Sequence, residues 1–319
     1  MGEFDLIDRY FKRPAAQAVL GVGDDCALWA PRAGMQLALS TDMLVEGRHF
    51  LSTVSPEALG HKALAVNLSD LAACGAKPCA FLLSLALPRV DENWLAGFSK
   101  GLWALADQFH CDLIGGDTTQ GPLNLNITVM GEVPAGQALL RSGAQAGDDI
   151  YVSGHLGDAR VALEVFRGNL SVPTPVFEAA RLRMERPTPR VALGQALRGL
   201  ATSAADISDG LLGDLSHILK ASHVGAVLEA PRLMHLLACG EELALPLQDQ
   251  LRWILTGGDD YELVFTAPAA LREQVTQAGV LAQTPVTCIG HVTNESGLTL
   301  LDTEGQPLAH DFVSFDHFA

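Results

Sequence analysis

Short apolar segments alternate with helical patterns along almost the whole chain of 319 residues. The pattern predicts strands at 36–42, 80–87, 111–115, 124–133, 150–154, 203–207, 224–229 and 261–266. It predicts helices at 56–75, 92–109, 157–167, 174–185, 190–200, 209–221, 246–255 and 268–278. Such an alternation is typical of an α/β protein.

The chain is long enough for two domains, since single domains run to roughly 100–200 residues. A segment rich in glycine and proline, residues 134–149, reads as the connection between them. We therefore expect an N-terminal domain at 1–138 and a C-terminal α/β domain at 139–319.

Five of the apolar segments run into glycine, serine or threonine and then into aspartate. These sites are residues 21–25, 40–42, 114–117, 206–210 and 256–260, and a sixth carboxylate, Asp70, lies inside a predicted helix. Glycine lets the backbone approach a ligand closely, and carboxylates at strand ends suit a hard cation bound through oxygen. Each aspartate could equally be a turn residue or a helix N-cap. The residues alone leave both interpretations open.

The negative net charge limits the classes of molecule that the chain is expected to bind. The chain has 37 acidic residues against 21 Lys and Arg, a formal net charge of −16. That sign repels nucleic acid and anionic membrane surfaces, so we expect neither as a partner. A phosphate ligand would need a divalent cation between it and the carboxylates.

The compartment is expected to be the cytoplasm. The acidic N-terminal residues do not resemble a signal peptide, and no apolar run is long enough for a membrane span. The six cysteines form no CxxC pair, which favours buried, reduced thiols over zinc or disulfides.

Common nucleotide motifs are missing. The sequence contains no P-loop, no GxGxxG and no kinase catalytic loop. A bound nucleotide would therefore be held by cations, backbone N–H groups and a few arginines. Arg141, in the connection between the domains, is the best such arginine, although a surface role is equally consistent with its position.

Taken in order, these motifs resemble those of the bacterial thiamine-monophosphate kinases over nearly the whole chain. The resembling stretches are 2–4, 21–25, 40–50, 62–70, 115–119, 141–144, 206–211, 257–263 and 315–318. The resemblance implies the two-domain fold of the aminoimidazole-ribonucleotide-synthetase superfamily. It also implies a homodimer in which the N-terminal sheets of two subunits form a barrel.

The implied activity is ATP-dependent phosphorylation of thiamine monophosphate to thiamine diphosphate, with several Mg²⁺ ions per site. The implied metal ligands are Asp25, Ser40, Thr41, Asp42, Asp70, Asp117, Asp206 and Asp209. The implied ATP contacts are Gly116, Asp117, Arg141 and Ser208, and the implied contacts to thiamine are His49, Asp259 and Phe315. Asp259 departs from the family pattern, in which glutamate is common at this position.

A phosphate acceptor is already ionised near neutral pH, so this reaction needs positioning and electrostatics more than a strong base. We therefore expect direct in-line transfer without a protein nucleophile.

Three alternatives are distinguishable. A selenophosphate synthetase would carry a reactive Cys with a Lys in a glycine-rich N-terminal segment. A hydrogenase-maturation dehydratase would end in a Cys-bearing tail. Neither feature is visible in this sequence. A non-enzymatic metal-binding protein would explain the carboxylates but not their association with glycine turns.

Overall fold

The computed structural model describes residues 2–240, 242–243, 245–309 and 312. The chain divides into two compact units. The first unit comprises Met1–Leu71 and Ala76–Gly136, and the second comprises Ala72–Gly75 and Gln137–Ala319. Each unit contains its own sheet.

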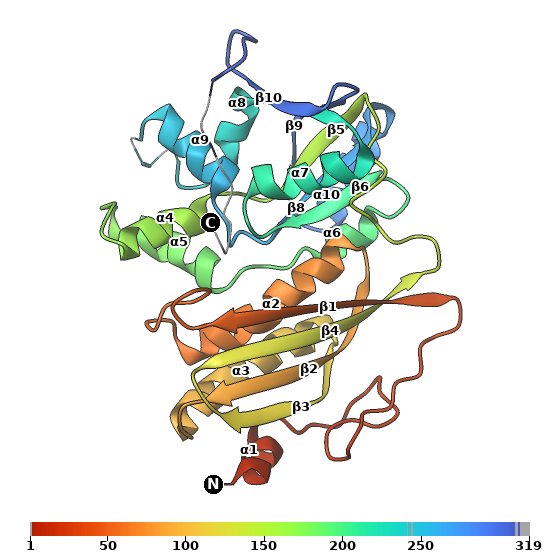
Figure 1. Cartoon of the computed structure of the whole chain (residues 1–319), viewed down its shortest axis with the longest axis vertical. Coiled ribbons are helices and arrows are strands. Elements are labelled where there is room, and N and C mark those ends of the chain that lie inside the picture. The colour runs from red at the N-terminus through yellow and green to blue at the C-terminus, as the bar shows by residue number, and fades with distance from the viewer. Residues whose placement is uncertain (1, 241, 244, 310–311, 313–319) are drawn as a thin grey trace. The chain divides into compact units, whose positions relative to one another are not determined.

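The first unit is built on a four-stranded sheet (Figure 1). Its strands lie in the order β1 (Met35–Val45), β4 (Asn124–Pro134), β2 (Lys77–Leu87) and β3 (Asp112–Gln120). β4 is antiparallel to both of its neighbours, whereas β2 and β3 run parallel. β1 and β3 are therefore the two edges, and the sheet of the single chain is open rather than closed. The expected barrel requires a second subunit and stays a prediction.

Helices α2 (Pro56–Ala73) and α3 (Glu92–Phe109) cover one face of this sheet (Figure 1), and α1 (Glu3–Tyr10) contacts α3 and β3. The helix pair packs closely through glycine. A Cβ on Gly60 would collide with the carbonyl oxygen of Phe98, and one on Gly101 would collide with that of Glu57. This close packing fixes α2, which carries Asp70, against the rest of the unit.

The two faces of the sheet differ in burial because strand residues alternate. Leu125, Ile127 and Val129 of β4 are buried beneath the helices. On the opposite face, Leu39 and Met43 of β1 are 63% and 56% exposed.

The second unit is built on a six-stranded sheet. The strand order is β10 (Gly297–Leu301), β7 (Gly225–Glu229), β9 (Val286–Thr293), β5 (Asp148–Ser153), β8 (Glu262–Pro268) and β6 (Ser203–Ile207). All pairs are antiparallel except β7 and β10. The helical segments are α4 (Asp158–Phe166), α5 (Thr174–Glu185), α6 (Val191–Ala196), α7 (Leu211–Ser222), α8 (Ala230–Leu233), η1 (Met234–Leu236), α9 (Leu247–Thr256), η2 (Ala269–Leu271) and α10 (Arg272–Leu281).

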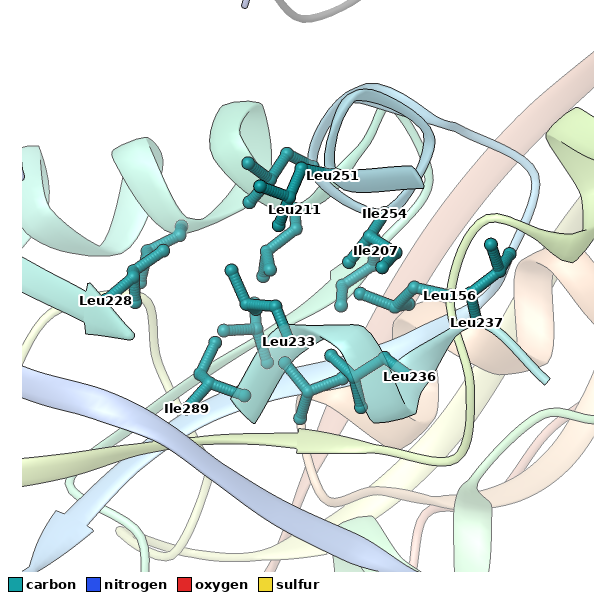
Figure 2. Close-up of a cluster of buried hydrophobic side chains, with 14 of the residues drawn as sticks. Leu156, Ile207, Leu211, Leu228, Leu233, Leu236, Leu237, Leu251, Ile254 and Ile289 are labelled. Carbon is teal, nitrogen blue, oxygen red and sulfur yellow. The ribbon is translucent and has the colours of Figure 1, made fainter. Parts of the chain in front are cut away.

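Aliphatic side chains from several of these elements form the core of the second unit (Figure 2). Ile207, the last residue of β6, and Leu211, the first residue of α7, are both fully buried in it. Leu251 and Ile254 of α9 join them in the same cluster (Figure 2). The loop 208–210 is therefore attached to the core at both ends.

The α/β class predicted from the sequence is confirmed. The bounds of α3, α5 and β6 coincide with the predicted ones. In α3 this agreement has a local cause, because Asp91 caps the helix by accepting hydrogen bonds from the backbone N–H groups of Asn93 and Trp94. The prediction omitted α1, α8, β9 and β10, and it started the helix near 268 too early, since η2 precedes α10.

The expectation of buried thiols is only partly correct. All six cysteines are free; Cys79, Cys111 and Cys239 are buried, Cys74 and Cys288 are half-buried, and Cys26 is exposed. Cys26 lies in the irregular segment between α1 and β1. Among the described residues, no helix is both long enough and apolar enough to cross a membrane.

Candidate active site

Three of the predicted metal ligands meet between β1 and α2 in the first unit. Ser40 Oγ donates a hydrogen bond to Asp70 Oδ2, although the two residues are 30 positions apart. The backbone N–H of Asp42 donates to Asn67 Oδ1 over 3.1 Å, and Asn67 Nδ2 donates to the carbonyl oxygen of Ala63 within α2. Asn67 and Asp70 are three residues apart, so they share one face of the helix. Ser40, Asp42 and Asp70 therefore form one group, in which Ser40 and Asp42 share a face of β1 and α2 supplies Asp70.

Thr41 lies differently from its neighbours. Its hydroxyl is 3.1 Å from the carbonyl oxygen of Ile127 and 3.0 Å from Thr128 Oγ1. Because alternate strand residues point to opposite faces, the Thr41 side chain is on the exposed face, away from those of Ser40 and Asp42. Only a main-chain atom of Thr41 could join the Ser40–Asp70 group.

A cavity of about 960 Å³ lies within the first unit. It is bordered by α1, by the glycine-containing segment that follows it, by the middle of β2 and by most of β3. Asp25, Gly116 and Asp117 line this one cavity, and Asp24 joins them. The Asp24 carboxylate accepts the backbone N–H of Asp25 over 2.8 Å, which shapes the turn. Residues that are nearly a hundred positions apart in the sequence thus line the same cavity.

Gly116 explains why glycine is needed in that wall. Its φ is +147°, and a Cβ there would collide with the carbonyl oxygen of Leu83 on the neighbouring strand. Any larger residue would push β3 away from β2. Gly116 therefore holds Asp117 in register beside Ser84 at the edge of the sheet.

In the second unit, the loop between β6 and α7 carries Ser208 and Asp209. The backbone N–H groups of both residues donate to Asp214 Oδ2, over 3.0 and 3.2 Å. Burial raises the pKa of Asp214 to about 6, and the negative charge of Asp209 adds to that shift. Arg141 acts on the Asp214 pKa in the opposite direction, through its positive charge. Asp206, which precedes the loop on β6, is 7% exposed.

The segment that carries Arg141 is fixed to β6 and α7. The carbonyl oxygen of Leu140 accepts the backbone N–H of Ala204 over 2.9 Å. Ser222 Oγ accepts the N–H groups of Gly143 and Ala144, each over 3.1 Å. Arg141 itself is exposed, so its guanidinium can reach a ligand from a fixed backbone.

Asp259 adopts a left-handed backbone conformation with a φ of +72°. Its N–H donates to the carbonyl oxygen of Ser208 over 2.9 Å, and its carboxylate accepts the hydroxyl of Tyr261 over 3.1 Å. Non-glycine residues rarely adopt this conformation, and it persists where the surroundings enforce it. Asp259 is thus tied to the loop that carries Ser208 and Asp209.

The carboxylates of half-buried Asp260 and buried Glu262 hold the start of β8, which follows Asp259. Asp260 accepts the N–H of Gly157 over 2.9 Å, and desolvation raises its pKa well above the usual range. Glu262 forms a bidentate ion pair with Arg190 and accepts the hydroxyl of Ser153. The segment 257–262 is therefore held at several points.

The two remaining residues that were predicted to contact thiamine are His49 and Phe315. His49 Nδ1 accepts the backbone N–H of Val45 over 3.0 Å, so the ring closes the turn that follows β1. Phe315 lies outside the described residues.

The predicted metal ligands are spread over three groups: Ser40 with Asp42 and Asp70, Asp25 with Asp117, and Asp206 with Asp209. Among the described residues, no three His, Cys, Asp or Glu side chains lie close enough to form a metal site by themselves. Serine hydroxyls, backbone oxygens and ligand phosphates would have to complete any coordination shell.

Sequence reasoning missed two residues of these groups. Asn67 supports the backbone of Asp42, and Asp214 supports the loop 208–209. The signal for Asp214 was its spacing, since it stands five residues after Asp209, near the start of the predicted helix 209–221.

Comparison with known families agrees with this architecture. Residues 23–133 match the N-terminal domain of the AIR synthase related proteins, and residues 145–303 match their C-terminal domain. The chain is therefore an AIR synthase related protein.

Within this class, a thiamine-monophosphate kinase of Escherichia coli (strain K12) is 47% identical to the chain, covering 100% of it and 98% of the relative. The crystal structure of a thiamine-monophosphate kinase from Stenotrophomonas maltophilia K279a has a TM-score of 0.86 and 44% identity, over 97% of this chain and 98% of that one. The chain belongs to the thiamine-monophosphate kinase family. A further structure, described as AaThiL complexed with AMPPCP and TMP, has a TM-score of 0.76 and 29% identity, over 91% of this chain and 89% of that one.

Proposed function

We propose that this protein transfers the γ-phosphoryl group of ATP to thiamine monophosphate, which yields ADP and thiamine diphosphate. The observation that carries the proposal is the oxygen-rich group of Ser40, Asp42 and Asp70, in the same unit as a cavity walled by Asp25, Gly116 and Asp117. A relative's structure with both an ATP analogue and TMP supports the same pair of substrates.

We propose Gly116, Asp117, Arg141 and Ser208 as the residues that contact the nucleotide. A cavity of about 960 Å³ is within the size range of small-molecule sites, roughly 300–1,000 Å³. Gly116 lets the backbone approach a phosphate closely, and Arg141 supplies positive charge in an acidic chain.

The donor groups fit Mg²⁺. Ser40, Asp42 and Asp70 offer oxygen only, which suits a hard cation and not zinc. We propose Asp25, Ser40, Asp42, Asp70, Asp117, Asp206 and Asp209 as ligands, with Thr41 contributing through its main chain. Bound Mg²⁺ would neutralise phosphate charge during transfer.

The chain's own residues would position the reactants. Asp214 and Asn67 hold the backbones of candidate ligands, and Tyr261 holds the carboxylate of Asp259. His49, Asp259 and Phe315 are proposed for the thiamine end. The acceptor phosphate is already ionised, so direct transfer needs no base from the protein.

We further propose that the protein acts as a homodimer in the cytoplasm. The exposed apolar face of β1 supports a second copy as partner. Three buried, free cysteines support a reducing compartment.

A coupled ADP-release assay with thiamine monophosphate tests the proposed function, with thiamine as the matched control. Thiamine lacks the reacting phosphate, and a misplacement of even ~1 Å can cost about 100-fold in rate. We expect ADP release with thiamine monophosphate and essentially none with thiamine. Comparable rates would identify a thiamine kinase instead.

Incubation with γ-labelled ATP alone tests whether a phosphoenzyme forms. It should leave no label on the denatured protein, whereas stoichiometric labelling would contradict direct transfer.

A further inference from the structure

The loop between β6 and α7 depends on one buried side chain. Ser208 and Asp209 lie beyond the last strand residue and before the first helical one. Their backbone N–H groups both donate to the same oxygen, Asp214 Oδ2. Asp214 stands one turn into α7 and is 5% exposed.

Resting on the function proposed above, we propose that Asp214 is a positioning residue for phosphoryl transfer. Its carboxylate fixes the backbone of Ser208 and Asp209, so that their side chains are presented to the nucleotide and its cation. Nothing in this role requires Asp214 to touch a substrate.

The surroundings of the loop explain why this support matters. Ile207 and Leu211 anchor its two ends in the apolar core (Figure 2). Gly210 has a φ of +108°, and a Cβ there would lie within 3.0 Å of the backbone of Thr256. The ends of the loop are therefore fixed by packing, whereas Asp214 holds residues 208 and 209 between them.

The same loop also reaches the proposed thiamine end of the site. The carbonyl oxygen of Ser208 accepts the N–H of Asp259. A shift of Ser208 would move Asp259 as well, so Asp214 influences residues proposed for both substrates.

Protein stability alone does not explain why the buried residue at position 214 is an aspartate. A buried carboxylate loses its hydration, and an apolar residue of similar size often stabilises a protein more. A requirement for two aligned N–H groups accounts for the carboxylate directly.

Two substitutions of similar size separate these explanations. In Asp214→Asn, the amide oxygen can still accept both N–H groups because a single oxygen accepts them in the wild type. In Asp214→Leu, the volume is kept but no acceptor remains. The readout is the affinity for a non-hydrolysable ATP analogue with Mg²⁺, measured by calorimetry, together with turnover of thiamine monophosphate.

We expect Asp214→Leu to weaken analogue binding at least about tenfold and to lower turnover by about 100-fold, since small misplacements have effects of that size. Asp214→Asn should stay within about threefold of the wild type in both. If Asp214→Leu does not fold, Asp214→Glu replaces it, because the longer side chain displaces the acceptor oxygen and should weaken analogue binding similarly.

Asp158→Leu is the matched control. Asp158 is 2% exposed, lies in the first turn of α4, and accepts the backbone N–H of Cys239 over 3.2 Å. The Asp158→Leu substitution should lower the melting temperature without changing the affinity for the ATP analogue.

Equal binding and turnover in Asp214→Leu and Asp214→Asn would overturn the proposal, and so would an Asn variant as impaired as the Leu variant. If the wild type bound the analogue but left thiamine monophosphate unchanged, the proposed substrate would be wrong. The difference in binding between the two variants would still decide the role of Asp214.

Discussion

Asp42 and Asp117 illustrate how single carboxylates are placed for charge rather than for packing. Asp117 is exposed on the cavity wall, and Asp42 is half-buried beside Asn67. Neither belongs to the apolar core, so removing either charge should affect ligands more than folding.

We therefore expect Asp42→Asn and Asp117→Asn to lower turnover by at least about 100-fold, a size typical when a charge that stabilises the transition state is lost. The melting temperature should change little. Asp107→Asn is the control, because Asp107 forms a surface ion pair with Arg13. Turnover of either variant close to that of the wild type at saturating Mg²⁺ would count against the proposed site.

At the scale of elements, the Arg190–Glu262 ion pair joins the residue before α6 to the first residue of β8. The Arg190 and Glu262 side chains are 17% and 3% exposed. Removing one partner of such a pair leaves a buried charge without compensation.

Arg190→Met should reduce the free energy of unfolding by about 3–5 kcal/mol, as measured by urea denaturation. Arg167→Met provides the comparison, since Arg167 is 52% exposed where it pairs with Glu164, and its loss should cost about 1 kcal/mol or less. Similar losses in both variants would show that the Arg190 pair has no special role.

Asp149 on β5 gives a pH-dependent contribution to stability. The hydrogen bonds from Arg272 at the start of α10 lower its pKa, with a further contribution from the hydroxyl of Tyr151. A lowered native pKa stabilises the fold above the unfolded pKa, and this stabilisation is lost as the pH falls through the native pKa.

The free energy of unfolding of the wild type should therefore decline below roughly pH 4. Asp149→Asn should be less stable at pH 7 and should lose less on acidification. Denaturation curves between pH 3 and 7 measure both slopes. Parallel slopes for the two proteins would exclude a contribution from Asp149.

For the whole molecule, the exposed face of β1 is the feature that predicts assembly. Leu39 and Met43 lie on the face opposite α2, beside Met130 and Asn126 of β4. Apolar side chains gathered on one open sheet are typical of an interface between symmetric copies.

Leu39→Glu should convert a dimer into monomers at micromolar concentration, because it places a charge in the apolar interface. Sedimentation measures the change. Val280→Glu is the control, since Val280 is 66% exposed on α10 in the second unit, and it should leave the dimer intact. A wild-type monomer at the same concentration would refute the proposed assembly.

Local patterns in the sequence were sufficient for the α/β class and for most elements. Asp91 marks the start of α3. The strand period also puts Thr41 on the face opposite Ser40 and Asp42, which the implied ligand set of all three residues did not take into account. The motif Asp206-Ile207-Ser208-Asp209-Gly210 likewise identified a strand end followed by a loop, because glycine and short polar residues favour turns there.

Only the tertiary structure decided which of these residues meet. The contact of Ser40 with Asp70, the shared wall of Asp25 and Asp117, and the position of β9 between β5 and β7 depend on pairings between distant segments. Sequence periodicity reports which face a residue occupies within its own element. It carries no information about the partner element, which is selected by packing and by hydrogen bonding of the whole chain.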